Sequence, residues 1–390
     1  MDVVVAFGTK PCTIKMAPLV KELEKRGHEV TILYTGQHWS PNMYSELFDD
    51  LELRHPDYDL KCGEDSRSLP QLTSLIISRS EKVLKKVKPD IVLTHGDTTT
   101  SLAVSQTAYM SLFPVGHIEA GLRTFSREPF PEQLNTRVTD ASSDYFFAPT
   151  EMNARFLLNE GFPKDRIVVV GNTVVDVAKW AAKRKPDILK KYGLEKPLVY
   201  LSVHRRETTM DRKRFSGPFD AAREFDDVNF FVSMRPGTKK ALVNFGMLNQ
   251  LKKTSHIATS DSLSSYVETI SMINQCEAIL TDSGSMQEEA AALHIPCLTL
   301  RYVTDRPETV DSGANLLVGL KKGEVLDGLR RVLRDGALAK KMRSAKSPYG
   351  DGDSSMRIVR FLEKAHEGGN LIRFEKAVRS SNKSRSTTRI

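Results

Sequence analysis

Short apolar runs alternate with segments of helical periodicity along the first 180 residues. Six apolar runs recur, each followed by a turn or a polar loop: residues 3–7, 30–34, 91–93, 113–118, 145–147 and 167–170. Between them, apolar residues fall at helical spacing near residues 70–87, 98–110, 132–141 and 151–160. Buried strands that alternate with amphipathic helices are typical of βαβ units on a parallel sheet.

A second set of such units begins after the basic, proline-containing segment 183–186. Its expected strands are residues 198–201, 228–232, 278–280 and 297–300, and its expected helices lie near 211–225, 238–246, 262–274, 284–293 and 322–335. We therefore predict an α/β fold with two doubly wound, Rossmann-like domains whose carboxyl strand ends face a central cleft. The predicted domains are 1–182, joined by a helix at 353–366, and 183–352.

The chain length and charge distribution support two domains and a separate tail. At 390 residues the chain exceeds the roughly 250–300 residues at which single cores stop growing. Of its net charge of +8, six basic residues and one acidic residue in 368–390 supply +5. We predict that 367–390 is a disordered basic tail, and that neither nucleic acid nor membrane is a partner.

Cysteine usage and the first residues indicate where the protein works. The four cysteines lie far apart without a C-x-x-C pair, which fits a reducing cytoplasm. No apolar run approaches the roughly 18 residues of a membrane helix, and the N-terminal apolar stretch is short for a signal peptide. The histidines and acids lack the spacing of metal ligands, so we assign no metal.

Acidic residues follow three predicted elements of the first domain. Asp97 and Glu119 come directly after apolar runs, and Glu132 opens a helical segment behind Pro131. Alone, Asp97 reads as a helix cap and Glu132 as a first-turn acid. Together, and with His95, His117 and Arg123 beside them, the three acids indicate a shared polar site.

The second domain places anion-binding groups at its strand ends. His204 and Arg205 follow the first strand, and arginine pairs with phosphate through its planar fork. The turn Thr281-Asp282-Ser283-Gly284-Ser285 joins a strand to a helix through small residues, where backbone N–H groups can meet a phosphate. Arg306 follows a further strand end. This division suits a nucleotide-sugar, with its diphosphate on the second domain and its sugar against the first.

Several segments, in this order, resemble the non-hydrolysing UDP-N-acetylglucosamine 2-epimerases over residues 2 to 365. The matching motifs are Gly8-Thr9-Lys10-Pro11, Ile14-Lys15-Met16-Ala17-Pro18, His95-Gly96-Asp97-Thr98-Thr99-Thr100, His117-Ile118-Glu119-Ala120-Gly121-Leu122-Arg123, Gly171-Asn172-Thr173, His204-Arg205-Arg206-Glu207, Thr281-Asp282-Ser283-Gly284, Gln287-Glu288-Glu289-Ala290, Arg306-Pro307-Glu308 and Pro348-Tyr349-Gly350-Asp351-Gly352.

The resemblance implies a GT-B arrangement, a homodimer, and reversible epimerisation at C2 without metal, nicotinamide or other cofactor. The reaction is anti elimination of UDP, a bound 2-acetamidoglucal, and readdition. The implied catalytic residues are Asp97, Glu119, Glu132 and His204. The implied substrate-binding residues are Lys10, Lys15, Arg205, Ser283, Gly284, Ser285, Glu289 and Arg306.

The chain departs from the family pattern at a few of these positions. Lys10 and Cys12 stand where the family usually has arginine and glutamate, and Ser285 replaces a glycine. Thr136 stands in place of an arginine, and Arg137 would point about 100° away from that position on a helix. Two alternatives therefore stay open: a GT-B glycosyltransferase, and a catalytically impaired paralogue that binds UDP-sugars.

Overall fold

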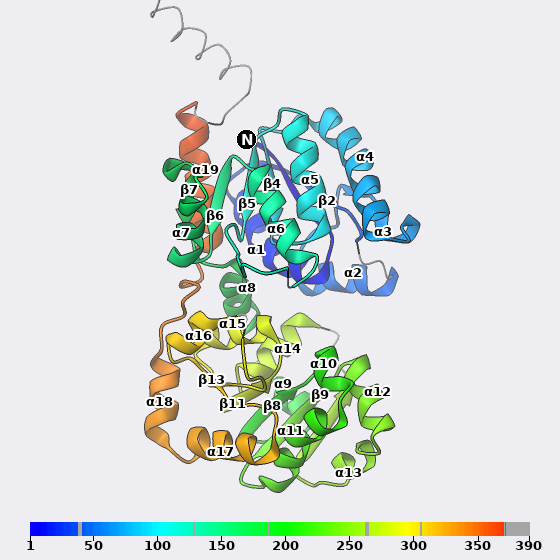
Figure 1. Cartoon of the computed structure of the whole chain (residues 1–390), viewed down its shortest axis with the longest axis vertical. Coiled ribbons are helices and arrows are strands. Elements are labelled where there is room, and N and C mark those ends of the chain that lie inside the picture. The colour runs from blue at the N-terminus through cyan, green and yellow to red at the C-terminus, as the bar shows by residue number, and fades with distance from the viewer. Residues whose placement is uncertain are drawn as a thin grey trace, which may run out of the picture. The chain divides into compact units, whose positions relative to one another are not determined.

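The structure is a computed structural model that describes residues 1–37, 41–127, 129–185, 187–261, 265–304, 306–369 and 371. The chain divides into two compact units, Met1–Thr173 together with the C-terminal segment from Asp353, and Val174–Gly352 (Figure 1). Residues 174–182, which the sequence pattern assigns to the first domain, belong to the second unit.

The first unit is a parallel seven-stranded sheet in the order β3-β2-β1-β4-β5-β6-β7. Its strands are β1 (Asp2–Phe7), β2 (Glu29–Tyr34), β3 (Tyr58–Asp59), β4 (Ile91–His95), β5 (Val115–Ile118), β6 (Tyr145–Ala148) and β7 (Ile167–Val169). Its helices are α1 (Lys10–Lys25), α2 (Pro41–Asp50), α3 (Cys62–Asp65), α4 (Leu69–Val87), α5 (Thr99–Met110), α6 (Glu132–Ala141), α7 (Glu151–Asn159), the 3-10 turn η1 (Lys164–Arg166) and α19 (Ser354–Glu367). The strand order reverses between β1 and β4, where such folds bind ligands.

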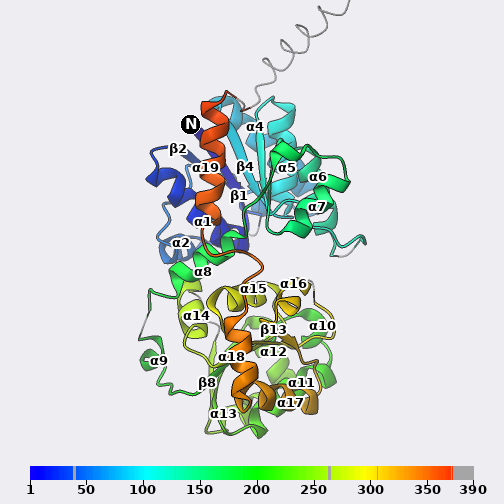
Figure 2. The ribbon, with the colours of Figure 1, turned by 90° about the vertical axis from the view of Figure 1, so that its left-hand side faces the viewer.

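Helices cover both faces of this sheet because its strands are apolar on both sides. Val4 and Val92 lie in one core cluster with residues of α4 and α5. On β6, Tyr145 and Phe147 instead contact the ring of Phe361, which belongs to α19. Figure 2 shows α19 running alongside this unit next to α1. The last helix of the chain is therefore part of the first unit's fold.

The second unit is a parallel six-stranded sheet in the order β10-β9-β8-β11-β12-β13. Its strands are β8 (Leu198–Ser202), β9 (Asn229–Met234), β10 (Ile257–Asp261), β11 (Ala278–Thr281), β12 (Cys297–Thr299) and β13 (Asn315–Leu317). Its helices are α8 (Thr173–Ala181), α9 (Ile188–Lys191), α10 (Arg206–Thr209), α11 (Arg212–Glu224), α12 (Pro236–Asn244), α13 (Leu248–Lys252), α14 (Tyr266–Ile273), α15 (Gly284–Leu293), α16 (Pro307–Asp311), α17 (Lys322–Leu333) and α18 (Gly336–Ser344).

A phenylalanine-rich core fixes α11 onto this second sheet. Phe215 and Phe219 of α11 are fully buried in one cluster with Phe230 of β9 and residues of α17. On the opposite face, Phe231 stacks on Tyr200. Both units are thus doubly wound parallel sheets with helices on both faces, which confirms the predicted α/β fold class.

The sequence pattern missed some short elements and one buried residue. The strands β3, β10 and β13 were not predicted, because they are two to five residues long and partly polar. Leu371, inside the expected tail, is buried, and its N–H donates to the carbonyl of Ala365. Residues 370 and 372–390 of that tail lie outside the described residues. In the described part of the chain, every helix is too short or too polar to cross a bilayer.

Candidate active site

The three acid-bearing segments of the first unit are tied together by hydrogen bonds. The Gly96 N–H donates to the carbonyl of Ile118 over 2.8 Å, which joins the segments after β4 and β5. The side-chain amide of Asn135 in α6 donates to the carbonyl of Asp97 over 2.9 Å. The segments that carry Asp97, Glu119 and Glu132 are therefore neighbours at the carboxyl end of the sheet, beside the switch point.

Glu119 lies at the centre of this site in a strained backbone conformation. Its φ of +66° is left-handed, which costs a residue other than glycine about 1–3 kcal/mol. The Lys15 ammonium donates to Oε1 over 2.5 Å, and Asn172 donates to the same oxygen. Oε2 lies 3.4 Å from Nε2 of His95. The Glu119 side chain is 9% exposed, so these partners offset the loss of hydration of its carboxylate.

Burial keeps two groups near Glu119, the His95 imidazole and the Cys12 thiol, uncharged. Burial lowers the pKa of His95 to about 4, although the nearby Glu119 carboxylate opposes the shift. Burial also raises the pKa of the Cys12 thiol to about 12, which Asp97 and Glu119 reinforce. At neutral pH the site thus holds a neutral imidazole, a protonated thiol and the Lys15–Glu119 pair.

The other two acids are less enclosed than Glu119. Glu132 is the first residue of α6, and its Oε2 atom is buried without a hydrogen-bond partner in the described part of the protein. Asp97 is half-buried in the loop between β4 and α5, where the hydroxyl of Thr98 caps the helix. The helix-cap role considered for Asp97 therefore belongs to Thr98. Among the described residues, the buried Oε2 of Glu132 is thus left without the hydrogen bond that a buried carboxyl oxygen normally makes.

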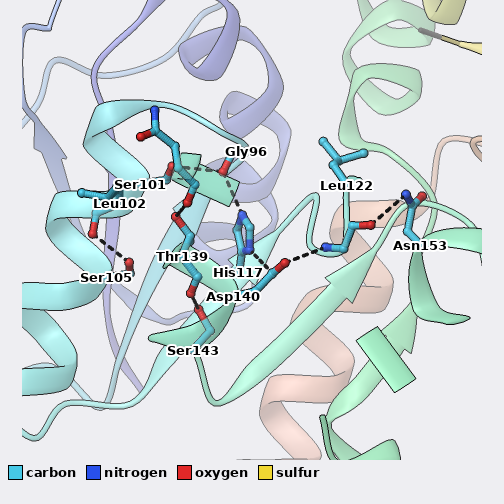
Figure 3. A network of polar contacts seen from close by, with 12 residues as sticks. Gly96, Ser101, Leu102, Ser105, His117, Leu122, Thr139, Asp140, Ser143 and Asn153 are labelled. Atoms are coloured by element: carbon cyan, nitrogen blue, oxygen red, sulfur yellow. Dashed lines mark hydrogen bonds and ion pairs between the residues drawn. The ribbon is translucent and has the colours of Figure 1, made fainter. Parts of the chain in front are cut away.

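His117 and Arg123 do not line the site as the sequence pattern suggested, because both side chains are fully buried. His117 Nδ1 lies 2.6 Å from Oδ1 of Asp140, and Arg123 lies 2.8 Å from the other oxygen of that carboxylate. Figure 3 shows His117 between Gly96 and Asp140. Sequence reasoning missed Asp140, although an acid in the last turn of a helix opposes the helix dipole and indicates a cationic partner.

In the second unit, Asp282 shapes the loop that carries His204 and Arg205. Its buried carboxylate accepts the N–H of His204 over 3.0 Å and the N–H of Arg205 over 2.9 Å. The Arg205 Nε donates to the Asp282 carbonyl over 2.9 Å. The loop after β8 is thereby fixed against the loop after β11. The sequence analysis quoted Asp282 in a motif without giving it this role.

His204 is neutral in the free protein. Burial, together with the nearby guanidinium groups of Arg235 and Arg205, lowers its pKa to about 3. The same cationic surroundings would stabilise a bound phosphate.

The start of α15 presents uncapped backbone donors. Ser283 is the N-cap residue, yet its side chain makes no capping hydrogen bond and lies 3.3 Å from the hydroxyl of Ser285. Gly284 begins the helix, and Glu289 is buried one and a half turns later. A helix N-terminus with free N–H groups is a ready anion site.

Arg306 is held by Glu288, which lies on the same helix as Glu289. Its Nε donates to Oε1 of Glu288 over 2.6 Å, and the Glu288 side chain is nearly fully buried. Beside them, the hydroxyl of Tyr349 donates to Glu308 over 3.3 Å. This places the Arg-Pro-Glu and Pro-Tyr-Gly-Asp-Gly motifs next to each other.

Two of the unusual positions have clear surroundings. Lys10 is exposed at the first position of α1. Thr136 is fully buried in α6, while Arg137 lies on the surface 3.9 Å from Glu160. Arg137 therefore does not replace the arginine missing at 136.

Acidic side chains at the strand ends of one Rossmann-like unit, and an arginine loop and an uncapped helix start on the other, are the groups expected of an enzyme that acts on nucleotide-linked substrates. A family profile described as UDP-N-acetylglucosamine 2-epimerase matches residues 21–363. The UDP-N-acetylglucosamine 2-epimerase of Methanocaldococcus jannaschii is 38% identical over 372 residues, which cover 93% of this chain and 99% of that protein. The chain belongs to the UDP-N-acetylglucosamine 2-epimerase family.

Solved structures agree with this assignment. The Neisseria meningitidis UDP-GlcNAc 2-epimerase bound to UDP-GlcNAc aligns with a TM-score of 0.83 and 33% identity, over 93% of this chain and 100% of that one. A spinosyn rhamnosyltransferase aligns over 93% of this chain and 100% of that one, with a TM-score of 0.53 and 16% identity, which shows a shared fold alone. The fold class is therefore GT-B-like.

Proposed function

We propose that this chain interconverts UDP-N-acetylglucosamine and UDP-N-acetylmannosamine by eliminating and re-adding UDP. Family membership over most of the chain and the strained, enclosed Glu119 carboxylate support this proposal. The C2–H bond and the C1–O bond break, a C1=C2 double bond forms, and UDP departs. The C2 carbon then takes a proton on its other face, and UDP adds back to C1.

The second unit supplies the groups for the UDP moiety. The hydroxyl of Ser283, the N–H groups of Gly284 and Ser285 and the Arg205 guanidinium are the proposed diphosphate contacts, and Lys10 and Lys15 are candidates from α1. Glu289 would hold the ribose and Arg306 the sugar. Asp282 and Glu288 support this assignment because each fixes one of the two arginines before the ligand arrives.

The carboxylates of the first unit supply the proton transfers. Asp97, Glu119 and Glu132 are the proposed acid–base residues, and their segments are hydrogen-bonded neighbours. A bound diphosphate would favour the protonated form of His204, which could then donate to the departing oxygen. The proton that His204 gives up on elimination returns to it on readdition.

The test is NMR of UDP-N-acetylglucosamine incubated with the protein in D2O. We expect deuterium at C2 together with the manno epimer. A transfer of the sugar to an acceptor, with C2 unchanged, would instead indicate a glycosyltransferase. Tight UDP-sugar binding without C2 exchange would indicate an impaired paralogue and would refute the proposal.

We further propose a homodimer that works in the cytoplasm. Tyr109, Met110 and Leu112 at the end of α5 expose apolar side chains, which a subunit interface would cover. The four cysteines are unpaired thiols, which suits a reducing compartment. Light scattering of the purified protein should give twice the chain mass of 43.7 kDa. A monomer at micromolar concentration would contradict the dimer.

A further inference from the structure

One buried carboxylate contacts or supports every segment that carries a proposed acid–base residue. Asp140 lies in the last turn of α6, the helix that begins with Glu132. Its Oδ1 lies 2.6 Å from Nδ1 of His117 on β5, and its Oδ2 accepts the N–H of Gly121 over 3.2 Å. Gly121 is two residues beyond Glu119. Figure 3 shows Asp140 at the centre of these contacts.

The imidazole of His117 extends this network to the third segment. Its Nε2 donates to the carbonyl of Gly96 over 2.9 Å, and that carbonyl also accepts the hydroxyl of Ser101 over 3.0 Å. Gly96 immediately precedes Asp97. His117 therefore connects the loop of Asp97 with Asp140, and through Asp140 with α6.

The guanidinium of Arg123 also fixes the segment after Glu119. Arg123 pairs with Asp140 over 2.8 Å and with Glu160 over 2.6 Å, and its side chain is fully buried. These pairs hold the chain on the far side of the left-handed residue Glu119. A strained backbone persists only where its surroundings over-determine it.

We infer that Asp140 is a positioning residue for the epimerisation: it holds the segments of Asp97, Glu119 and Glu132 in the register that proton transfer needs. This inference rests on the proposed function. Misplacement of a reacting group by about 1 Å can cost on the order of 100-fold in rate. Most of the proposed UDP contacts lie on the second unit, so nucleotide affinity should depend little on Asp140.

The test compares Asp140→Asn with the matched control Asp144→Asn. Asp144 accepts the N–H of Val115 over 3.0 Å, at the opposite end of β5 from Glu119. We expect Asp140→Asn to lower kcat roughly 10–100-fold while KM and UDP affinity change less than about threefold. Asp144→Asn should keep kcat near the wild-type value even if both variants lose similar thermal stability.

Amide hydrogen exchange provides a readout that does not depend on activity. In Asp140→Asn, exchange should accelerate in residues 94–99 and 118–123 and in the first turn of α6, and in Asp144→Asn it should not. If the wild-type protein incorporates no deuterium at C2 of the substrate, the proposed function fails. The amide hydrogen exchange of the two variants still decides whether Asp140 fixes these segments.

A milder variant covers the case in which Asp140→Asn does not fold. His117→Asn retains an amide near the Nδ1 position but removes the bond to Gly96. This variant should lower kcat, and it should accelerate amide hydrogen exchange in residues 94–99 but not in the other two segments. Normal kcat in both Asp140→Asn and His117→Asn, or equal losses in Asp140→Asn and Asp144→Asn, would overturn the inference.

Discussion

Individual side chains at the candidate site are held in states that ordinary surface residues do not adopt. Glu119 is strained and enclosed, Lys15 is buried and forms an ion pair with Glu119, and His95 is a buried neutral imidazole. Such departures are concentrated at sites where a group must exchange protons. Each costs stability, and the surrounding contacts offset that cost.

The acid–base assignment predicts a specific kinetic effect. Glu119→Gln and Glu132→Gln should each lower kcat by about 10²–10⁴-fold, because each removes a proton-transfer group, while UDP affinity stays unchanged. Glu119→Gln should also lower the melting temperature, because it removes a carboxylate that pairs with the buried Lys15 ammonium. Steady-state kinetics and calorimetry with UDP measure both effects.

The surface variant Glu81→Gln is the control, since Glu81 is exposed on α4 and pairs only weakly with Lys85. It should behave as wild type. Near-normal turnover in both site variants would mean that the acids are misassigned.

The buried histidine predicts how stability depends on pH. The folded pKa of His95 is about 4, below the unfolded value near 6.5, so between these values the unfolded chain binds more protons. The contribution of neutral His95 to the free energy of unfolding is fully present above about pH 6.5 and is lost as the pH falls toward 4. A single such group changes the free energy of unfolding by about 1.4 kcal/mol per pH unit.

The variant His95→Gln should therefore lose less stability than wild type between about pH 7 and about pH 5. The substitution also changes the surroundings of Glu119, Lys15 and His117, which face His95. The quantity to compare is therefore the slope of stability against pH in the two proteins, and not their absolute stabilities. Thermal scans across this range measure the slopes. Parallel curves for the two proteins would rule out a neutral His95 in the folded state.

At the scale of elements, the ends of two helices carry residues of the proposed site. α6 carries Glu132 at its start and Asp140 in its last turn, so one helix both presents an acid and fixes the segments of the other two. α15 begins with an uncapped turn of small residues after β11. The positive end of its dipole is thereby left for an anion.

That helix start predicts the effect of a charge placed on it. Ser283→Asp should weaken UDP binding at least about 100-fold, because its carboxylate would lie against the diphosphate. Ser68→Asp, the same change at the exposed cap of α4 in the other unit, should leave UDP affinity unchanged. Isothermal calorimetry measures both. Wild-type affinity in Ser283→Asp would place the nucleotide elsewhere.

At the scale of the whole molecule, the last helix completes the first unit, and a truncation tests how much of the chain beyond it is needed. Truncation after Leu371 should leave the melting temperature and the activity unchanged, since most of the removed residues are basic or polar. Truncation after Gly368 also removes the buried Leu371 and should cost about 1–3 kcal/mol. Thermal scans measure the melting temperatures of the two truncated proteins. Equal and large losses would show that residues beyond 371 stabilise the body.

The sequence alone determined the fold class, because buried parallel strands must be continuous apolar runs and their helices must be amphipathic. It also singled out Glu119, Ser283 and Arg306, because polar and small residues directly after buried strands stand out against that pattern. The sequence pattern did not predict the short strands β10 and β13, since a few partly polar residues show no hydrophobic periodicity.

Only the tertiary structure decided which polar residues bear on the chemistry and which support the fold. In the sequence, His117 and Arg123 are basic residues near a strand end, just as His95 is. In the structure they are buried against Asp140, which is 17 or more residues away in sequence. The positions of Asp140, Asn172 and Asp282 beside their partners depend on how distant strands and helices pack. Long-range ion pairs and hydrogen bonds leave no local periodicity, so a single sequence cannot reveal them.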